Sequence, residues 1–286
     1  MKRKKEWICL KRMLALLVAA TLLLYGVSCG KDSSKEVLLQ IYALDVGQGD
    51  CFLLRTGEGD ILIDAGTESS QELLCLRLEQ LGVTTLRLAI FTHPDEDHIG
   101  GADGVLQRFP AQEIWINGAE SEEECFTALL DAADACNVTP RAVKAGDALE
   151  IGDVVLFVLS PFGGEIESGN ADSIVLKIFC GNISAIFTGD ADLKAEQALL
   201  DYYGASQLDC DLYKVGHHGS NTSTGADFLE AMSPTLALIS SGKGNSYGHP
   251  HGDVLASLEA AGAKILRVDL LGEILLETDG IEIWQK

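Results

Sequence analysis

The chain has 286 residues, of which 47% are hydrophobic, which is enough for one large domain or two small ones with buried cores. Its 43 acidic and 21 basic side chains leave a formal net charge of -22. This charge excludes a protein that holds nucleic acid through a broad basic surface, because such binding needs Lys and Arg to displace counterions. An anionic substrate would have to be attracted locally, by bound cations.

A basic segment followed by an apolar one opens the chain. Residues 1–12 are rich in Lys and Arg and residues 13–27 are mostly apolar, which is the order of an export signal. The apolar stretch is short for a membrane span, which needs about 20 residues. It ends at Gly26-Val27-Ser28-Cys29, which resembles a bacterial lipoprotein cleavage site with Cys29 as the lipidated residue, although Gly26 stands where Leu is usual.

Residues 1–29 are therefore expected to be a signal peptide and residues 30–36 a polar linker. Lipidation at Cys29, an uncleaved N-terminal anchor and simple secretion remain open, and all three place the protein outside the cytoplasmic membrane. Six further cysteines lack the short paired spacing of a zinc knuckle or a redox motif: Cys51, Cys75, Cys125, Cys136, Cys180 and Cys210. Buried free thiols are favoured over disulfides, because several of these cysteines lie in apolar runs.

Residues 37–286 read as one domain of short alternating strands and helices with no long linker. In the first half we expect strands at 37–44, 51–55, 61–64 and 88–92, and helices at 69–81, 99–109 and 120–136. In the second half we expect strands at 154–159, 173–179, 183–188, 211–215 and 236–240, helices at 193–203, 225–232 and 252–261, and two closing strands. Two such halves predict an α/β (α+β) fold in which paired sheets are covered by helices on both outer faces.

The strand at 88–92 runs into His93-Pro94-Asp95-Glu96-Asp97-His98, and Gly100-Gly101 let the next helix begin close to this loop. The two His and two Asp side chains of the run can bind a metal ion. Functional loops tend to follow the ends of rigid strands. The spacing therefore predicts a metal site here, against the alternative of a merely charged loop.

This run resembles the signature His-x-His-x-Asp-His of the metallo-β-lactamase superfamily, with Asp95 in place of the second His. The variant is similar to the hydrolase domain of the ComEC competence DNA-uptake proteins and its free-standing relatives. Further segments match the same subgroup in the same order, at residues 45–50, 63–66, 187–190, 214–220 and 245–250. The resemblance implies an αββα sandwich of two mixed sheets.

The resemblance also implies two divalent metal ions with six protein ligands: His93, Asp95, Asp97, His98, Asp190 and His218. The first ion would take His93 and Asp95, and the second Asp97, His98 and His218, with Asp190 shared. His218 is preferred to its neighbour because the family's ligand is the His directly before Gly. The family supplies one more His to the first ion, and the nearest residue here is Asn170, a weaker donor. The oxygen-rich set moves preference from zinc toward manganese, and the imidazoles keep zinc open.

Supporting roles are expected around these ligands. Asp64 matches a family position that orients ligands through hydrogen bonds. Asp45 and Asp50 flank a Gly-Gln-Gly loop that either reaches the site or is only a tight turn. His217 is expected to contact substrate or support a ligand, against the alternative of a packed imidazole. Lys214 could support the site or contact phosphate.

His249 is the leading catalytic candidate, with His217 and Asp97 beside it. It follows the strand at 236–240, so it would share a rim with His218 if successive strands run parallel. Its imidazole could then hydrogen-bond a phosphate oxygen or act as a general acid. The alternative is a His that only caps the helix near Gly252.

Hydrolysis is the expected chemistry, because two divalent ions activate water and neutralise charge on a phosphoryl or acyl oxygen. The ComEC resemblance favours a phosphodiesterase, with extracellular DNA as the leading substrate. Another phosphoester hydrolase of the cell envelope, directed at phosphorylcholine or a nucleotide, is an alternative. So is a surface lipoprotein that keeps the fold without activity. Lactam hydrolysis is disfavoured because Asp95 replaces the expected His. The N-terminal lipid or anchor implies a membrane partner, and no protein partner is indicated.

Overall fold

The computed structural model describes residues 35–163 and 169–286, and the expected export signal with Cys29 lies outside them. Glu36–Lys286 pack together as one unit. Across the described ranges, no helix has both the length and the apolar character needed to cross a membrane. The six cysteines of this unit are free thiols.

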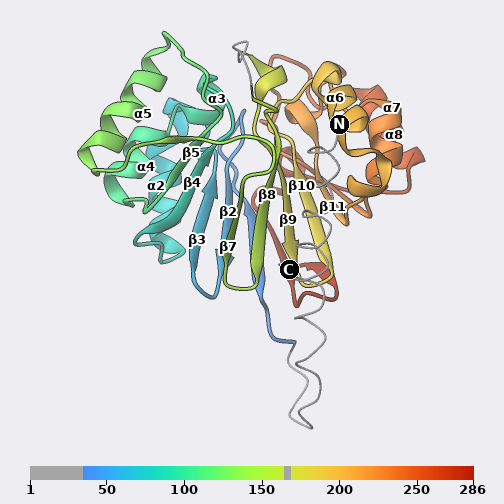
Figure 1. Ribbon diagram of the computed structural model, residues 1–286, viewed down its shortest axis with the longest axis horizontal. Helices are drawn as coiled ribbons and strands as arrows, with labels where there is room; N and C mark the ends of the chain where they lie inside the picture. The colour runs from blue at the N-terminus through green and yellow to red at the C-terminus, as the bar shows by residue number, and fades with distance from the viewer. Residues whose placement is uncertain (1–34, 164–168) are drawn as a thin grey trace, which may run out of the picture. The chain divides into compact units, whose positions relative to one another are not determined.

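Two β-sheets form the centre of this unit (Figure 1). The first has eight strands in the order β15 (Ile283–Gln285), β14 (Ile274–Thr278), β1 (Leu39–Ala43), β2 (Phe52–Thr56), β3 (Gly59–Ile63), β4 (Leu86–Phe91), β5 (Ile114–Ile116) and β6 (Arg141–Ala142). The second has seven strands in the order β13 (Lys264–Arg267), β12 (Leu236–Ile239), β11 (Leu212–Lys214), β10 (Ile183–Phe187), β9 (Val175–Cys180), β8 (Val154–Ser160) and β7 (Ala148–Ile151). Each sheet mixes parallel and antiparallel pairs.

Helices cover the outer face of each sheet, as Figure 1 shows. The first sheet carries α2 (Gln71–Gln80), α3 (Glu96–Ile99), α4 (Ala102–Arg108) and α5 (Glu124–Ala135). The second carries α6 (Leu193–Tyr203), α7 (Ala226–Met232) and α8 (Gly252–Ala260), and the short α9 (Val268–Leu271) follows β13. Short 3-10 turns complete the elements at η1 (Glu68–Ser70), η2 (Asn170–Asp172), η3 (Ala205–Gln207) and η4 (Gly216–Gly219). The predicted αββα sandwich is confirmed.

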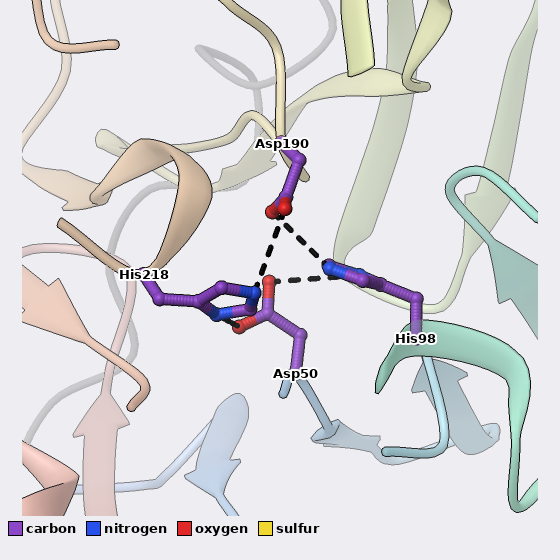
Figure 2. Close-up of side chains that lie close together, drawn as sticks. All are labelled: Asp50, His98, Asp190 and His218. Atoms are coloured by element: carbon purple, nitrogen blue, oxygen red, sulfur yellow. Dashed lines mark ion pairs between the residues drawn. The ribbon is translucent and has the colours of Figure 1, made fainter. Parts of the chain in front are cut away.

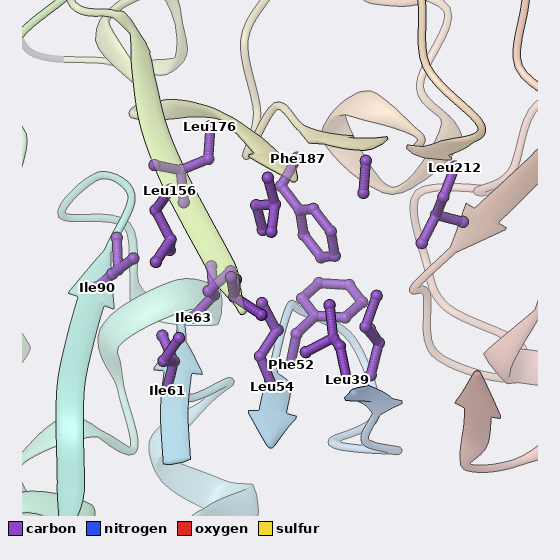
Figure 3. Close-up of a cluster of buried hydrophobic side chains, with 14 of the residues drawn as sticks. Leu39, Phe52, Leu54, Ile61, Ile63, Ile90, Leu156, Leu176, Phe187 and Leu212 are labelled. Carbon is purple, nitrogen blue, oxygen red and sulfur yellow. The ribbon is translucent and has the colours of Figure 1, made fainter. Parts of the chain in front are cut away.

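The two sheets are held together by a layer of buried apolar side chains between them (Figure 3). Phe52 of β2 meets Phe187 of β10 edge to face, with ring centroids 5.1 Å apart. Leu53, next to Phe52, points to the opposite face and packs with Leu74 and Leu78 of α2. Because side chains alternate along a strand, a strand buried on both faces is apolar throughout.

The structure differs from the sequence prediction mainly in its short elements. Strands β5, β6, β7 and β13 were not predicted individually, and three strands rather than two follow α8 in the described chain. The helix expected at 99–109 is split into α3 and α4, and α3 already begins at Glu96, inside the His-Pro-Asp-Glu-Asp-His run. The split lies at Gly100 and Gly101, where an added Cβ would collide with the backbone of Glu68 and Ala65.

Candidate metal centre

The edge where the two sheets come together collects the loops that carry the polar residues. In the second sheet β10, β11 and β12 run parallel, so their carboxyl ends lie at one edge. Asp190 follows β10, His218 follows β11 and Ser240 follows β12. In the first sheet β3 and β4 are also parallel, and they lead into Asp64 and His93. Ligand sites favour this end of parallel strands, because loops from several strands converge there.

A single turn of helix arranges the ligands of the main motif. Asp95 is the N-cap residue of α3, and its carbonyl oxygen accepts a hydrogen bond from the backbone N–H of His98 at 3.0 Å. Asp97 and His98 therefore lie on one turn directly above the end of β4. His93 precedes the turn, with its Nε2 3.4 Å from Oδ2 of Asp95.

Four buried side chains form the centre of the site (Figure 2). Each of Asp50, His98, Asp190 and His218 offers one donor atom, and these atoms lie within 4.8 Å of one another. Nε2 of His98 lies 3.2 Å from Oδ1 of Asp190, and Nε2 of His218 lies 3.5 Å from Oδ2 of the same carboxylate. The shared position of Asp190 between two imidazoles is what a bridging ligand requires.

The remaining predicted ligands surround this centre. Asp97 Oδ2 lies 3.1 Å from Nε2 of His218, and the rings of His93 and His98 have centroids 4.1 Å apart. His217 also reaches the site, with its Nε2 3.5 Å from Oδ2 of Asp190. Three of the six predicted ligands, His98, Asp190 and His218, lie in the centre with Asp50. Asp97 and His93 contact the centre, and Asp95 contacts His93.

Hydrogen bonds on the far side of two imidazoles fix how they face the centre. Nδ1 of His98 lies 2.8 Å from Oδ2 of Asp64. The same oxygen accepts from the hydroxyl of Thr92, and Oδ1 of Asp64 accepts from the backbone N–H of Thr92. Nδ1 of His218 lies 3.0 Å from the carbonyl oxygen of Ser240. An acceptor at Nδ1 keeps the proton there and leaves Nε2 free to bind a metal ion. Asp64 therefore occupies the orienting position that the sequence suggested.

A cation fits the centre because several buried polar atoms there make no hydrogen bond. They are Asp50 Oδ1, His93 Nε2, His98 Nε2, Asp190 Oδ1 and His218 Nε2. Buried polar atoms are normally hydrogen-bonded, so a group of orphans aimed at one place indicates a ligand. Imidazole nitrogens with carboxylate oxygens suit zinc and manganese alike.

Without a metal ion, protons supply the positive charge. Burial disfavours the charged imidazole, but Asp190 and Asp50 overcome this and raise the pKa of His218 to about 10. Burial also opposes ionisation of Asp190, yet His218 and His98 hold its pKa well below the usual value. A metal ion would replace these protons, so metal affinity should rise with pH.

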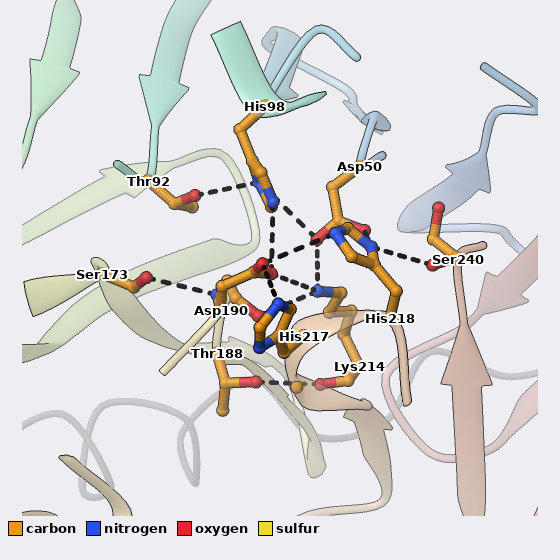
Figure 4. Close-up of polar contacts among 12 residues, drawn as sticks. Asp50, Thr92, His98, Ser173, Thr188, Asp190, Lys214, His217, His218 and Ser240 are labelled. Atoms are coloured by element: carbon orange, nitrogen blue, oxygen red, sulfur yellow. Dashed lines mark hydrogen bonds and ion pairs between the residues drawn. The ribbon is translucent and has the colours of Figure 1, made fainter. Parts of the chain in front are cut away.

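Lys214 is buried, and its ammonium group lies among the carboxylates and imidazoles of the site (Figure 4). Its side chain is 1% exposed, it forms an ion pair with Asp50, and it donates to the carbonyl oxygen of Gly189 at 2.9 Å. Its Nζ lies 3.9 Å from Oδ1 of Asp190. A buried ammonium held in this way cannot reach a phosphate at the surface. The geometry favours the supporting role for Lys214 over the substrate contact that the sequence left open.

The backbone around the site is strained. Asp64, His217 and His218 have φ values of 58°, 47° and 54°, a region that residues with a Cβ rarely adopt. Such strain costs on the order of 1–3 kcal/mol per residue and persists where function requires the conformation. The left-handed turn at His217 and His218 is what points both rings toward Asp190.

The sequence did not distinguish Asp45 from Asp50, and the structure gives the two residues different roles. Asp45 is exposed and accepts a hydrogen bond from the backbone N–H of Gly47 at 3.2 Å, which makes it a turn residue. Asp50 is buried in the centre. Asn170 contacts Nδ1 of His217 at 3.3 Å, and nothing places its side chain in the cluster of four.

His249 lies on the same rim as His218, as the parallel strands predict. The ring centroids of the two residues are 6.3 Å apart and the rings are close to parallel. The side chain of Asn245 holds the backbone of His249 on both sides, accepting from its N–H at 3.0 Å and donating to its carbonyl oxygen at 2.6 Å. Burial, together with His218 and His217, lowers the pKa of His249 to about 4. The helix cap of α8 is His251, so His249 is free of that role.

A two-sheet sandwich with a buried cluster of His and Asp at the strand ends defines a class of metal-dependent hydrolases. The family model described as the metallo-beta-lactamase superfamily matches residues 44–243, and the chain belongs to this superfamily. The resemblance inferred from the motifs is thereby confirmed.

Two curated bacterial relatives match most of this chain. The chain is 34% identical over 253 residues to ComE operon protein 3 of Bacillus subtilis, covering 82% of this chain and 32% of the relative. It is 34% identical over 269 residues to Competence protein ComA of Neisseria gonorrhoeae, covering 93% of this chain and 36% of the relative. The chain spans about a third of the length of these relatives.

The fold is shared with solved structures at low identity. CmlA, a diiron β-hydroxylase from Streptomyces venezuelae, matches 85% of this chain and 55% of its own chain, with a TM-score of 0.57 and 13% identity. At this identity the match shows the fold alone.

Proposed function

We propose that this protein is a metal-dependent phosphodiesterase that cleaves DNA outside the cytoplasmic membrane. The observation that carries the proposal is the convergence of His98, Asp190 and His218 with Asp50 around a group of orphaned polar atoms. Asp95 adds oxygen where the lactamase signature has nitrogen. This oxygen-rich set suits the hard cations that serve phosphoryl chemistry.

Divalent cations bound here would polarise a phosphoryl oxygen and supply a nucleophile from water near neutral pH. The protein's own residues hold and orient the metal ligands. Asp64 and the carbonyl oxygen of Ser240 fix the two imidazoles, and Lys214 fixes Asp50. His249 stands beside the centre, half-buried, and its buried Nδ1 makes no hydrogen bond in the described structure. The exposed part of its ring is the part proposed to meet a substrate oxygen.

DNA is proposed as the substrate because one relative is named a competence protein and the motifs resemble the ComEC hydrolase domain. The net charge of -22 is compatible with this choice only if cations bind at the centre, because the rest of the surface repels phosphate. The proposed location rests on the export-type segment at residues 1–27 and on Cys29 as a lipid site. A lipid or anchor there would tether the enzyme to the membrane.

The test is metal analysis of the purified chain followed by assays on linear DNA, bis-para-nitrophenyl phosphate and a lactam. We expect bound zinc or manganese and hydrolysis of both phosphodiesters. Asp190→Ala should lose at least one metal ion and nearly all turnover, because it removes the shared ligand. Asp45→Ala is the matched control, since Asp45 is an exposed turn residue, and it should retain both.

Other outcomes would replace the proposal. Turnover of phosphorylcholine or nucleotide esters without DNA cleavage would identify a different phosphoesterase of the cell envelope. Absence of stoichiometric metal would indicate a binding protein that keeps the fold. Hydrolysis of the lactam alone would contradict the role given to Asp95.

A further inference from the structure

Three near-parallel rings lead outward from the metal centre: His218, His249 and Tyr247. The centroids of His218 and His249 are 6.3 Å apart with 29° between planes, and those of His249 and Tyr247 are 5.6 Å apart with 21°. Exposure increases along this row, from a buried metal ligand through the half-buried His249 to Tyr247, which is 65% exposed. Among the described residues, Tyr247 has no ring contact with a metal ligand that would account for an exposed aromatic ring at the rim of the metal centre.

The loop that carries Tyr247 is held firmly. The carboxamide of Asn245 accepts from the backbone N–H of Tyr247 at 3.1 Å and donates to the carbonyl oxygen of Gly242 at 2.9 Å. Gly242 in turn packs against Gln48, whose side chain accepts from the N–H of Gly242 at 3.1 Å. The ring is therefore presented by an ordered loop, which lowers the entropy cost of stacking a ligand on it.

We propose that Tyr247 is the stacking surface for an unpaired nucleobase, and that it makes single-stranded nucleic acid the preferred substrate. This inference rests on the proposed phosphodiesterase function. One face of the Tyr247 ring lies toward His249, and its exposure leaves the other available to a base. A base stacked there would place its phosphate toward His249 and the metal centre.

The chemistry favours a base over a quaternary ammonium group. Cages for such groups enclose the cation with several aromatic faces, and the described ring contacts of Tyr247 are with His249 alone. A paired base hides its faces in the duplex, so stacking on Tyr247 selects unpaired nucleotides. Stacking of this kind accepts any base, because every base has a π face.

The test compares a single-stranded oligothymidylate with an abasic chain of equal length, which has the same phosphates and no bases. We expect KM to be lower for the oligothymidylate by roughly 5- to 150-fold, the range of one stacked base. Tyr247→Ala should raise KM for the oligothymidylate to the value for the abasic chain and leave cleavage of the abasic chain unchanged. Tyr247→Phe should keep the wild-type preference. Pairing the oligothymidylate with its complement should also raise KM.

Tyr202→Ala is the control, because Tyr202 is a 58% exposed aromatic residue on α6 and not part of the row of rings. Binding is measured in parallel by fluorescence anisotropy with hydrolysis-resistant phosphorothioate oligothymidylate and the corresponding abasic chain, in the presence of Mn²⁺. If the wild type binds the two chains equally, or Tyr247→Ala keeps the preference, stacking is overturned. If the wild type prefers the oligothymidylate in binding but cleaves neither chain, stacking stands and the phosphodiesterase proposal fails.

Discussion

Lys214 shows how one residue can serve a metal site without binding the metal. Its ammonium group is buried with the carboxylates of Asp50 and Asp190. Burial would lower the pKa of Lys214, but Asp50 and Asp190 raise it above the usual value. The lysine is therefore a permanent cation that balances part of the negative charge before any metal ion arrives.

Replacing this cation should make folding depend on metal. Lys214→Met leaves buried carboxylates uncompensated, which typically costs about 3–5 kcal/mol of unfolding free energy. We expect that loss in EDTA and a much smaller one in saturating Mn²⁺, because bound cations restore positive charge. Urea unfolding under both conditions measures it.

Lys177→Met is the matched control. Lys177 is also buried, but it donates to the carbonyl oxygens of Gln207 and Asp209, away from the metal ligands. The unfolding free energy that Lys177→Met loses should be the same in EDTA and in saturating Mn²⁺. An equal loss in both conditions for Lys214→Met would show that its charge is unrelated to the metal site.

His249 should act on substrate and not on metal. His249→Ala is expected to keep metal content and melting temperature while kcat falls by roughly 10²–10⁴-fold, the range for a lost hydrogen bond or proton transfer in a transition state. His251→Ala is the comparison, because Nδ1 of His251 accepts from the backbone N–H of Asn221 and serves the loop. Loss of a metal ion in His249→Ala would make His249 a ligand, and unchanged kcat would make it structural.

At the scale of elements, the β1–β2 loop and α3, which follows β4, lie at the same edge of the first sheet and build the site by direct contact. The β1–β2 loop carries Asp50, whose backbone N–H donates to the carbonyl oxygen of Asp97 at 3.1 Å. Gly49 permits this approach, because its φ is +130° and an added Cβ would collide with the carbonyl oxygen of Asp97. The carbonyl oxygen of Gly49 also accepts from the hydroxyl of Ser240 at 2.7 Å, so the β1–β2 loop, α3 and the loop after β12 meet at this glycine.

Gly49→Ala should therefore separate Asp50 from Asp97. We expect metal affinity to fall by at least tenfold, measured by calorimetric titration with Zn²⁺ or Mn²⁺, together with a lower melting temperature. Gly47→Ala is the matched control, because Gly47 also has a positive φ, of +75°, but has open space where the Cβ would lie. Gly47→Ala should lose only the roughly 1 kcal/mol that a strained φ costs and keep its metal affinity. If both changes lower metal affinity equally, the contact between Gly49 and Asp97 is not what positions Asp50.

For the whole molecule, the proposed tether sets where the acidic domain works. Stable anchoring needs more than one lipid chain, since a single chain holds a membrane only marginally. Cys29→Ser should move the protein to the medium or leave an unprocessed precursor, as cell fractionation and mass spectrometry would show. An unmodified Cys29 thiol in mature membrane-bound protein would contradict lipidation.

Most of the sandwich and the main metal-binding motif could be predicted from the sequence. Strands such as β10 and helices such as α6 carry enough apolar periodicity to be recognised, and His93, Asp95, Asp97 and His98 lie in one short run. Strands as short as β6, with two exposed residues, carry too little pattern to be predicted. β6 is held by its pairing with β5 and by the contact of Arg141 with the ring of Trp115.

Which of the remaining polar residues share the centre depends on contacts between distant segments and could not be predicted from the sequence. Asp45 and Asp50 look alike in the sequence, and only the contact of the β1–β2 loop with α3 buries one of them. Lys214 lies three residues before His217, yet the parallel order of β10, β11 and β12 brings it close to Asp190. Local pattern records which face of a strand is apolar. It does not record strand order or direction, and these bring residues as distant as Asp50 and His218 together.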